Sequence, residues 1–428
     1  MTLYLKDAQF IDYQSFAVSS TNLLVEPGPD GSISLLDNIP GTDALGNGDR
    51  IIDCKGKCVT KSFGCGHHHI YSTLARGMPP PHSIPTNFME ILEYVWWHID
   101  KRLDLGMIEA SALVTALYCA KNGVTFVIDH HSSPHAVKDS LPTIAAAFDK
   151  VGISHLLCYE LSDRDGRVSR DRGLEETEDY LKKGKQGLVG LHASFTVGDD
   201  LLEKAVVLAK RYDSGIHVHA AEDNIDQEDC IKNYGKRVIE RFAAAGVLEL
   251  RKSILAHCLH LNEKEWEILS GSQACVVQNI ESNLNNNVGF FNPKIKMTNL
   301  LLGTDGMHSD MLRSAKIAFL IGQQAEKISP AHIYGRFRKI HEYTKSNGFA
   351  GDGENNLAIL AYDSPTEIDA DNFLSHFIYG IESNHVESVI SDGKLIMKNR
   401  KIVTVDEEEI LSFSKENAKR LWERLRIP

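Results

Sequence analysis

Two histidines two positions apart are the residues of this sequence best suited to chemistry. His67 and His69 end an apolar run, and residues two apart in a β-strand point to the same face, so both can bind one metal ion. His219 and Asp305 stand at the ends of two later apolar runs, and Glu222 follows His219 by three residues. Polar side chains at several strand ends can converge on one point, which indicates a metal-dependent hydrolase.

Each of these residues has a simpler explanation when it is taken alone. A run of histidines is often an expression tag, but this run is internal. Asp305 lies in the tripeptide TDG and could be a turn residue or a helix cap. Taken together, imidazole and carboxylate ligands that leave one position open for water form a catalytic site suited to zinc or iron. The joint pattern therefore favours a metal site.

The segments that must position these residues alternate between strands and helices. Eight apolar runs in the centre of the chain predict strands at 58–69, 125–131, 154–160, 188–195, 215–222, 253–259, 274–283 and 299–305. Helical patterns such as DLLEKAVVLAKRY lie between most of them. The alternation predicts an α/β fold, a (β/α)8 TIM-type barrel, whose chemistry lies at the C-terminal strand ends. The polar residues at those ends are His67, His69, His130, His192, His219, His257 and Asp305.

The two ends of the chain read as short strands broken by Gly, Pro and Asp. We expect residues 1–56 and 354–428 to pair into one small β-sandwich domain, and residues 57–353 to form the catalytic barrel. A proline-rich segment at 78–87 is a candidate lid beside the site.

The composition narrows the class of partner. The chain has 428 residues, a net charge of −12 and no long basic stretch, which argues against nucleic acid or an anionic membrane. We see no signal peptide and no apolar run near the roughly 20 residues that span a bilayer. The eight cysteines are scattered, which is typical of reduced thiols in a cytoplasm. The sequence predicts a cytoplasmic protein that acts on a small molecule.

In this order, the motifs resemble the amidohydrolase superfamily, and within it the branch of deaminases and chlorohydrolases. The likeness rests on His67-x-His69, His219-x-x-Glu222, AHC at 256–258 and GTDG at 303–306. Longer segments, among them HIYSTLARGM, HVHAAED, ESNLNNNVGF and LGTDGMHSDM, are most similar to the SsnA group of aminohydrolases. These segments span most of the chain, but a superfamily hosts many reactions and does not define a substrate.

The resemblance implies a metal centre. Its ligands would be His67, His69, His219 and Asp305. The fourth strand ends in His192 and offers no lysine that could be carbamylated to bridge two ions, which favours one divalent metal, zinc before iron. The Pro-Gly that usually precedes the first histidine motif is replaced here by KSFG at 61–64. The resemblance therefore does not define the conformation of the turn at this point.

The resemblance also implies the catalytic and substrate-binding roles. Glu222 would shuttle protons, His257 would stabilise developing charge, and Asp305 would accept a proton from the attacking water. His192 and Asn283 would face the substrate.

The residues alone do not decide the roles of three further positions. His130, or its neighbour His131, ends a strand on the catalytic side of the barrel and could contact the substrate. Arg76 could bind a substrate carboxylate or carbonyl, or could only pair with an acid. His217 shares a strand face with His219 and could be a core histidine or have a direct role.

The leading hypothesis is hydrolytic deamination of a purine-like or other nitrogen heterocycle, with hydroxide adding to a carbon that bears an amino group. The alternatives are ring opening of a cyclic amide, or removal of a halide as in a chlorohydrolase. A third possibility is a non-catalytic metal-binding relative. The resemblance implies a homodimer or larger assembly.

Overall fold

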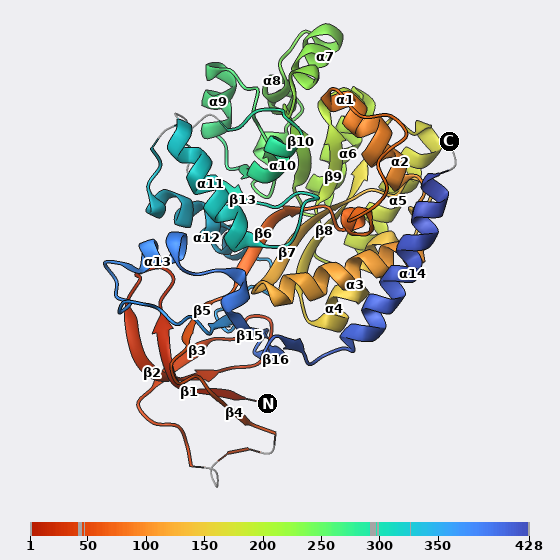
Figure 1. Cartoon of the computed structure of the whole chain (residues 1–428). Helices are drawn as coiled ribbons and strands as arrows, with labels where there is room; N and C mark the ends of the chain where they lie inside the picture. The colour runs from red at the N-terminus through yellow and green to blue at the C-terminus, as the bar shows by residue number, and fades with distance from the viewer. Residues whose placement is uncertain are drawn as a thin grey trace.

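Eight parallel strands form a barrel at the centre of the molecule (Figure 1). The computed structural model describes all residues except 1, 42–44, 47, 292–296, 298, 326 and 427–428. The barrel strands, in their order around the sheet, are β6 (Phe63–His68), β7 (Val124–His131), β8 (Ser154–Leu161), β9 (Val189–Ala193), β10 (Ile216–Ala220), β11 (Ile254–His257), β12 (Cys275–Gln278) and β13 (Leu300–Leu302). The predicted (β/α)8 fold is confirmed.

Helices cover the barrel. They are α3 (Leu105–Lys121), α4 (Ser140–Val151), α5 (Gly166–Lys182), α6 (Asp199–Arg211), α7 (Asn224–Tyr234), α8 (Val238–Ala244), α9 (Glu263–Ser270), α10 (Ile280–Asn285), α11 (Met311–Ala325) and α12 (Pro330–Ser346). In α6, apolar residues three or four apart are buried. Its first turn carries Asp199 and Asp200 and its last turn Lys210 and Arg211, so the charges complement the helix dipole.

The barrel closes where β13 meets β6. The backbone N–H groups of Thr304 and Asp305 donate to the carbonyl oxygen of His67, at 3.0 and 3.1 Å. Gly303 is needed at this seam, because a Cβ there would lie 2.4 Å from the Asn279 Oδ1 and 2.8 Å from the His67 carbonyl oxygen. The closure brings the first and last predicted ligand motifs together.

Two predicted strands end differently in the structure. The run at 58–69 is two strands, because β5 (Cys58–Lys61) pairs in another sheet and only β6 belongs to the barrel. The run at 274–283 leaves the sheet after Gln278. The Asn283 N–H donates to the carbonyl oxygen of Asn279 at 3.0 Å, which is the first turn of α10, so Asn283 is helical.

The two ends of the chain build a second sheet. Its strands are β1 (Leu3–Ile11), β2 (Val18–Val25), β3 (Ile33–Leu36), β4 (Arg50–Asp53), β5, β14 (Leu357–Leu360), β15 (Val386–Ser391), β16 (Lys394–Lys398) and β17 (Lys401–Ile402). N- and C-terminal segments join where β5 pairs with β14. This sheet has an apolar core of its own, which includes Leu5, Leu23, Val59 and Ile359. β5 belongs to this sheet although it begins at Cys58, beyond the expected boundary at residue 56. The exact bounds of the two domains stay a prediction.

The C-terminal helices pack outside that sheet. α13 (Phe373–Tyr379) precedes β15, and α14 (Glu407–Leu425) runs alongside α3 of the barrel (Figure 1). Trp422 Nε1 donates to the carbonyl oxygen of Leu74, and Arg424 Nη1 to that of Arg102, each at 2.8 Å. These bonds attach the end of the chain to the barrel.

The segment between β6 and β7 is helical near the mouth of the barrel. It contains a 3-10 turn at Ile70–Ala75, α1 (Phe88–Ile91), a π-helical turn at Leu92–Trp96 and α2 (Trp97–Asp100). In the described part of the chain, no single helix is long and apolar enough to cross a membrane. Phe88–Asp100 and Leu105–Lys121 meet the length and composition criteria only as a pair, which is bent by 107°.

A buried ion cluster connects the two parts of the molecule, and Asp352→Asn is expected to weaken it. The Asp352 carboxylate lies 3.2 Å from Lys61 Nζ and 2.9 Å from His341 Nδ1, and it accepts a hydrogen bond from Thr344 Oγ1 at 2.7 Å. The amide would leave Lys61 as a buried charge with a weaker partner, so we expect a loss of about 3–5 kcal/mol in the free energy of unfolding. Urea unfolding of both proteins measures this difference.

The pH dependence of unfolding gives a second measure of the Asp352 cluster. Burial opposes ionisation, but His341 and Lys61 hold the pKa of Asp352 well below its usual value of 3.8. Since the folded pKa is depressed, the stabilisation is present above about pH 4 and is lost as the pH falls below it. The Asn variant should lose that part of the acid dependence. Equal stability of the two proteins at pH 7 would contradict the assignment.

Candidate metal centre and active site

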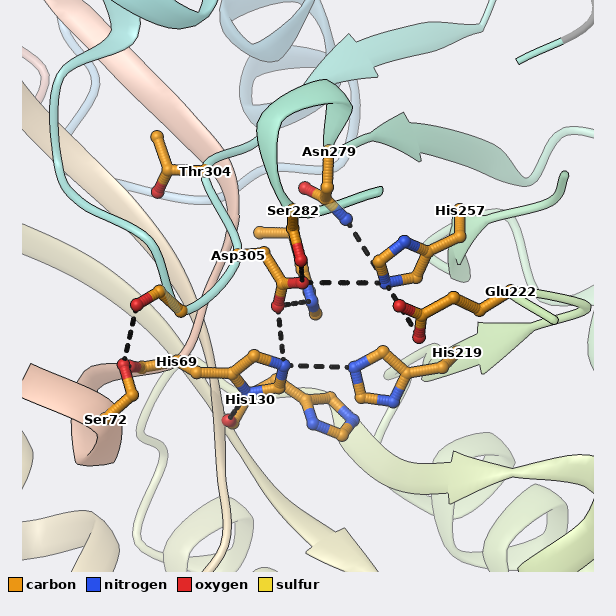
Figure 2. Close-up of polar contacts among 12 residues, drawn as sticks. His69, Ser72, His130, His219, Glu222, His257, Asn279, Ser282, Thr304 and Asp305 are labelled. Carbon is orange, nitrogen blue, oxygen red and sulfur yellow. Dashed lines mark hydrogen bonds and ion pairs between the residues drawn. The ribbon is translucent and has the colours of Figure 1, made fainter. Parts of the chain in front are cut away.

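Three imidazoles and one carboxylate meet at the C-terminal end of the barrel. His69 Nε2 lies 2.9 Å from Asp305 Oδ1 and 3.1 Å from His219 Nε2, and His67 Nε2 lies 3.4 Å from the same Asp305 oxygen. Each residue offers a ligand atom, and these four atoms lie within 4.8 Å of one another. Figure 2 shows His69, His219 and Asp305 pointing toward a common centre. The structure brings together all four residues that the sequence predicted as ligands.

The other ring nitrogens of these histidines orient the site. His69 Nδ1 donates to the carbonyl oxygen of His130, and His219 Nδ1 to that of His192, each at 2.7 Å. In the neutral form of each ring, Nε2 therefore carries the lone pair that faces the centre. His67 Nδ1 lies 2.9 Å from His217 Nε2, so His217 is a partner of a predicted ligand.

The donor set fits a divalent metal ion. His67 Nε2 is buried, and none of the described residues forms a hydrogen bond with it, so a bound cation would give this nitrogen a partner. Burial lowers the pKa of His67 to about 3, so this imidazole is neutral at pH 7 and can bind a cation. Burial opposes ionisation of Asp305, but His69 and His67 hold its pKa well below the usual range. Burial opposes protonation of His69, but Asp305 raises its pKa to about 9, so this imidazole must give up a proton when it binds a cation. Imidazole and carboxylate groups are ligands that zinc prefers.

Glu222 and His257 form a pair beside this centre. Glu222 Oε2 lies 3.5 Å from His257 Nε2, and Asn286 Nδ2 donates to Glu222 Oε1 at 3.4 Å. Burial raises the pKa of Glu222, and the nearby Asp305 raises it further. A carboxyl group with a raised pKa keeps its proton to a higher pH than an exposed glutamate does, which suits it to donate a proton to a substrate and take it back.

His257 is fixed from two sides. Its Nδ1 lies 2.7 Å from Asn283 Oδ1, and its Nε2 lies 4.0 Å from Asp305 Oδ2. Backbone φ angles of +70° at His257 and +52° at Asp305 place both residues in the left-handed region, which is strained for residues other than glycine. Such strain is typical of functional sites. The hydrogen bond to Asn283 keeps the His257 Nε2 directed at the centre.

A buried aspartate holds the turn that carries Glu222. Asp226 accepts hydrogen bonds from the backbone N–H groups of Ala221 at 2.8 Å and Phe195 at 3.0 Å. Ala221 has a φ of +47°, so the chain leaves β10 in a strained turn that these bonds stabilise. The turn swings Glu222 toward His257.

A cavity opens above the centre. Its space amounts to about 780 Å³ when the open solvent at its mouth is included. Apolar side chains on one side come from the helical segment between β6 and β7. They are Phe88, Leu92, Trp96 and Trp97. The polar side includes His69, Glu160, His192, His219, Glu222, Ser282, Asn286 and Asp305.

One of the four predicted substrate-binding residues lines this cavity. His192 lines it, with its Nδ1 2.6 Å from Thr196 Oγ1. Asn283 contacts His257 instead, and the fully buried His130 ring contacts the carbonyl oxygens of Leu191 and His217 from below the cavity.

Arg76 and the proline-rich segment lie elsewhere. Arg76 is exposed, and its guanidinium stacks on the ring of Tyr118 at 4.9 Å. Residues 78–83 of the proline-rich segment line a separate groove with Trp422 and Leu425 of α14. The cavity wall on this side comes from the helical turns that follow it.

Sequence reasoning gave no role to Glu160, although it carries the same signal as the ligands. It stands near the C-terminal end of β8, is buried, and lines the cavity. Ser282 was missed as well, and its hydroxyl donates to Asp305 Oδ2. No strand pattern marks Ser282, since it lies on α10.

Comparison with known proteins places the chain among metal-dependent hydrolases. Residues 60–334 match the model of the amidohydrolase family. A 5-methylthioadenosine/S-adenosylhomocysteine deaminase from Syntrophomonas wolfei is 27% identical, over 94% of this chain and 96% of the relative. A 5'-deoxyadenosine deaminase from Methanopyrus kandleri is 29% identical, over 83% of this chain and 84% of the relative. The structure of an adenosine deaminase from Xanthomonas campestris with bound zinc has a TM-score of 0.81 at 18% identity, over 100% and 99% of the two chains.

Proposed function

This chain belongs to the amidohydrolase family, and from that premise we propose that it catalyses the metal-dependent hydrolytic deamination of a purine-like heterocycle. The observation that carries the proposal is the position of Glu222, a carboxyl group with a raised pKa at the wall of a cavity beside a His/Asp centre. The deaminase activity named for both relatives, each of which acts on an adenosine-like compound, supports the same reaction.

The proposed ligands of the metal ion are His67, His69, His219 and Asp305, and we propose zinc. Zinc is bound in the Xanthomonas campestris deaminase of the same fold. The end of β9 carries His192 in place of a lysine that could bridge two ions, which supports a single ion.

A zinc ion held by these four residues would supply hydroxide at neutral pH, because a bound divalent ion lowers the pKa of water toward about 7. Asp305 Oδ2 takes the proton that the attacking water releases. Glu222 gives its proton to a ring nitrogen as the carbon–oxygen bond forms, takes up the proton held by Asp305, and passes it to the amino group, which leaves as ammonia. The proton of the added hydroxyl group then returns Glu222 to its protonated form. His257 Nε2, held by Asn283, stabilises the oxygen that develops negative charge. The balance is one water consumed and one ammonia released.

We also propose a cytoplasmic location and a homodimer or larger assembly. All eight cysteines are buried and unpaired, which is the usual state of thiols in a reducing compartment. Mass measurement in solution at several protein concentrations would test the assembly.

Ammonia release from a panel of purines, pterins and pyrimidines tests the reaction. The zinc-loaded protein is expected to release one ammonia for each molecule of a purine-like substrate converted. A new carboxylate without ammonia would instead indicate ring opening, and chloride release from a chlorinated ring would indicate a chlorohydrolase. Metal-loaded protein that converts none of these compounds would contradict the proposal.

A further inference from the structure

Glu160 is a buried carboxylate at the cavity that the proposed chemistry does not use. Its side chain is 4% exposed, and it lines the cavity beside His192 and Trp97. One of its oxygens lies within 4.8 Å of a ring nitrogen of His69 and of His219. The carboxylate is therefore close to the place where the substrate reacts.

The protein satisfies this carboxylate only in part. Oε2 lies 3.2 Å from His130 Nδ1, but Oε1 is 3.9 Å from Arg164 Nη2, which is beyond hydrogen-bond distance. Arg164 is held by other acids, because its Nη2 donates to Asp100 and its Nε lies 3.0 Å from Asp165. Among the residues that the structure describes, none donates a hydrogen bond to Oε1 of Glu160. A buried carboxylate oxygen in this state needs a donor from elsewhere.

A second metal ion is a less suitable partner for the Glu160 carboxylate than a hydrogen-bond donor. Glu160 and His130 form a metal-like group only together with His69 and His219. Those two imidazoles already direct Nε2 toward Asp305 and use Nδ1 for backbone carbonyl oxygens. A second ion would keep two ligands of its own, fewer than the three or four of ordinary zinc sites.

We propose that Glu160 selects the substrate by accepting a hydrogen bond from a ring N–H or amino group of the heterocycle. This inference rests on the proposed function, since it concerns the same cavity. The donor belongs to the reacting ring and not to an attached sugar, because Glu160 is so near the histidine nitrogens of the centre. A ring edge with only lone pairs would face a negative charge and bind poorly.

The two cavity carboxyl groups then recognise the ring in opposite ways. Glu222 donates its proton to a ring nitrogen, whereas Glu160 accepts a hydrogen bond from a ring N–H. Glu160 lies near the end of β8 and Glu222 follows β10, so the two groups reach the ring from separate strands. The substrate class is a purine-like base that carries an acceptor nitrogen for one and an N–H donor for the other.

A binding experiment tests Glu160 without turnover. Zinc-loaded Glu222→Gln protein is titrated with hypoxanthine in a calorimeter, and so is the Glu160→Gln, Glu222→Gln double variant. We expect the second substitution to raise the Kd for hypoxanthine about 10- to 100-fold, because a charge-assisted hydrogen bond is lost. The zinc content should be equal in both proteins. Of 1-methylhypoxanthine and 7-methylhypoxanthine, the one that lacks the relevant N–H should bind both proteins alike.

The control is Asp165→Asn in the same Glu222→Gln background. Asp165 contacts Arg164 but does not line the cavity, so this change perturbs the same ion network without removing the proposed acceptor. We expect it to change the Kd less than about two-fold, as is usual for substitutions away from a site. A loss equal to that of Glu160→Gln would show that Arg164 placement matters, and would overturn the role of Glu160 as acceptor.

Two further results would overturn the inference. One is a Kd for hypoxanthine that Glu160→Gln leaves unchanged, or no binding of hypoxanthine by the parent. The other is an effect of Glu160→Gln on inosine that disappears with 2',3'-dideoxyinosine, which would assign the carboxylate to sugar hydroxyls. Binding of hypoxanthine that depends on Glu160, in a protein that releases no ammonia from any compound, would keep this inference and reject deamination.

Discussion

Glu222→Gln is expected to leave the metal content and fold unchanged and to lower kcat for ammonia release by about 10²- to 10⁴-fold, the usual contribution of a general acid–base. The amide has the size of the carboxyl group and can keep the hydrogen bond from Asn286 Nδ2 to its oxygen. It cannot give a proton to the ring nitrogen or to the leaving amine. Steady-state ammonia assays on the zinc-loaded proteins measure the loss.

Glu228→Gln is the matched control for this substitution. Glu228 is exposed on α7, six positions after Glu222, and undergoes the same chemical change away from the cavity. It should keep the activity of the parent. If Glu222→Gln lost less than about three-fold in kcat, the proton shuttle would have to be another group, because such a loss is far below that of an acid–base catalyst.

His219→Gln is expected to release the metal ion and abolish activity. Loss of a residue that merely orients a ligand typically costs 10- to 100-fold in metal affinity, so loss of a ligand should cost more than about 10²-fold. The change also removes the hydrogen bond from His219 Nδ1 to the carbonyl oxygen of His192 at the end of β9. Zinc content after dialysis, and competition with a chelator of known affinity, measure the change.

An exposed histidine provides the control for the metal experiment. His332 lies on the surface of α12, where its Nδ1 is 2.8 Å from Ser329 Oγ. His332→Gln should bind zinc with the affinity of the parent. One zinc ion per chain at parental affinity in His219→Gln would remove His219 from the ligand set.

Much of the barrel could be predicted because its signals are local. The barrel strands are short and largely buried runs, as in VTFVIDHH of β7, in which all eight residues are buried. Where polar residues interrupt such a run, as in the predicted strand at 58–69, the predicted strand ends were wrong. Lys61 and Ser62 gave no sign that β5 leaves for another sheet, because that depends on pairing with β14, almost 300 residues later.

The site residues divide in the same way. The sequence by itself determined the polar residues that end the strands, because parallel strands in a closed barrel bring their C-terminal ends to one rim. His67, His69, His219 and Asp305 needed no more than that rule to meet.

Only the tertiary structure decided which other side chains reach the cavity. Beyond the end of a strand, the direction of a side chain depends on the turn that follows and on the packing of the next helix. Asp226 holds the turn that aims Glu222, and α10 turns Asn283 toward His257 instead of the substrate. Glu160 ends a strand as the ligands do, but its unsatisfied oxygen appears only when Arg164 is seen to bind other acids. Strand patterns encode position along the barrel, whereas hydrogen-bond partners come from segments far apart in the chain.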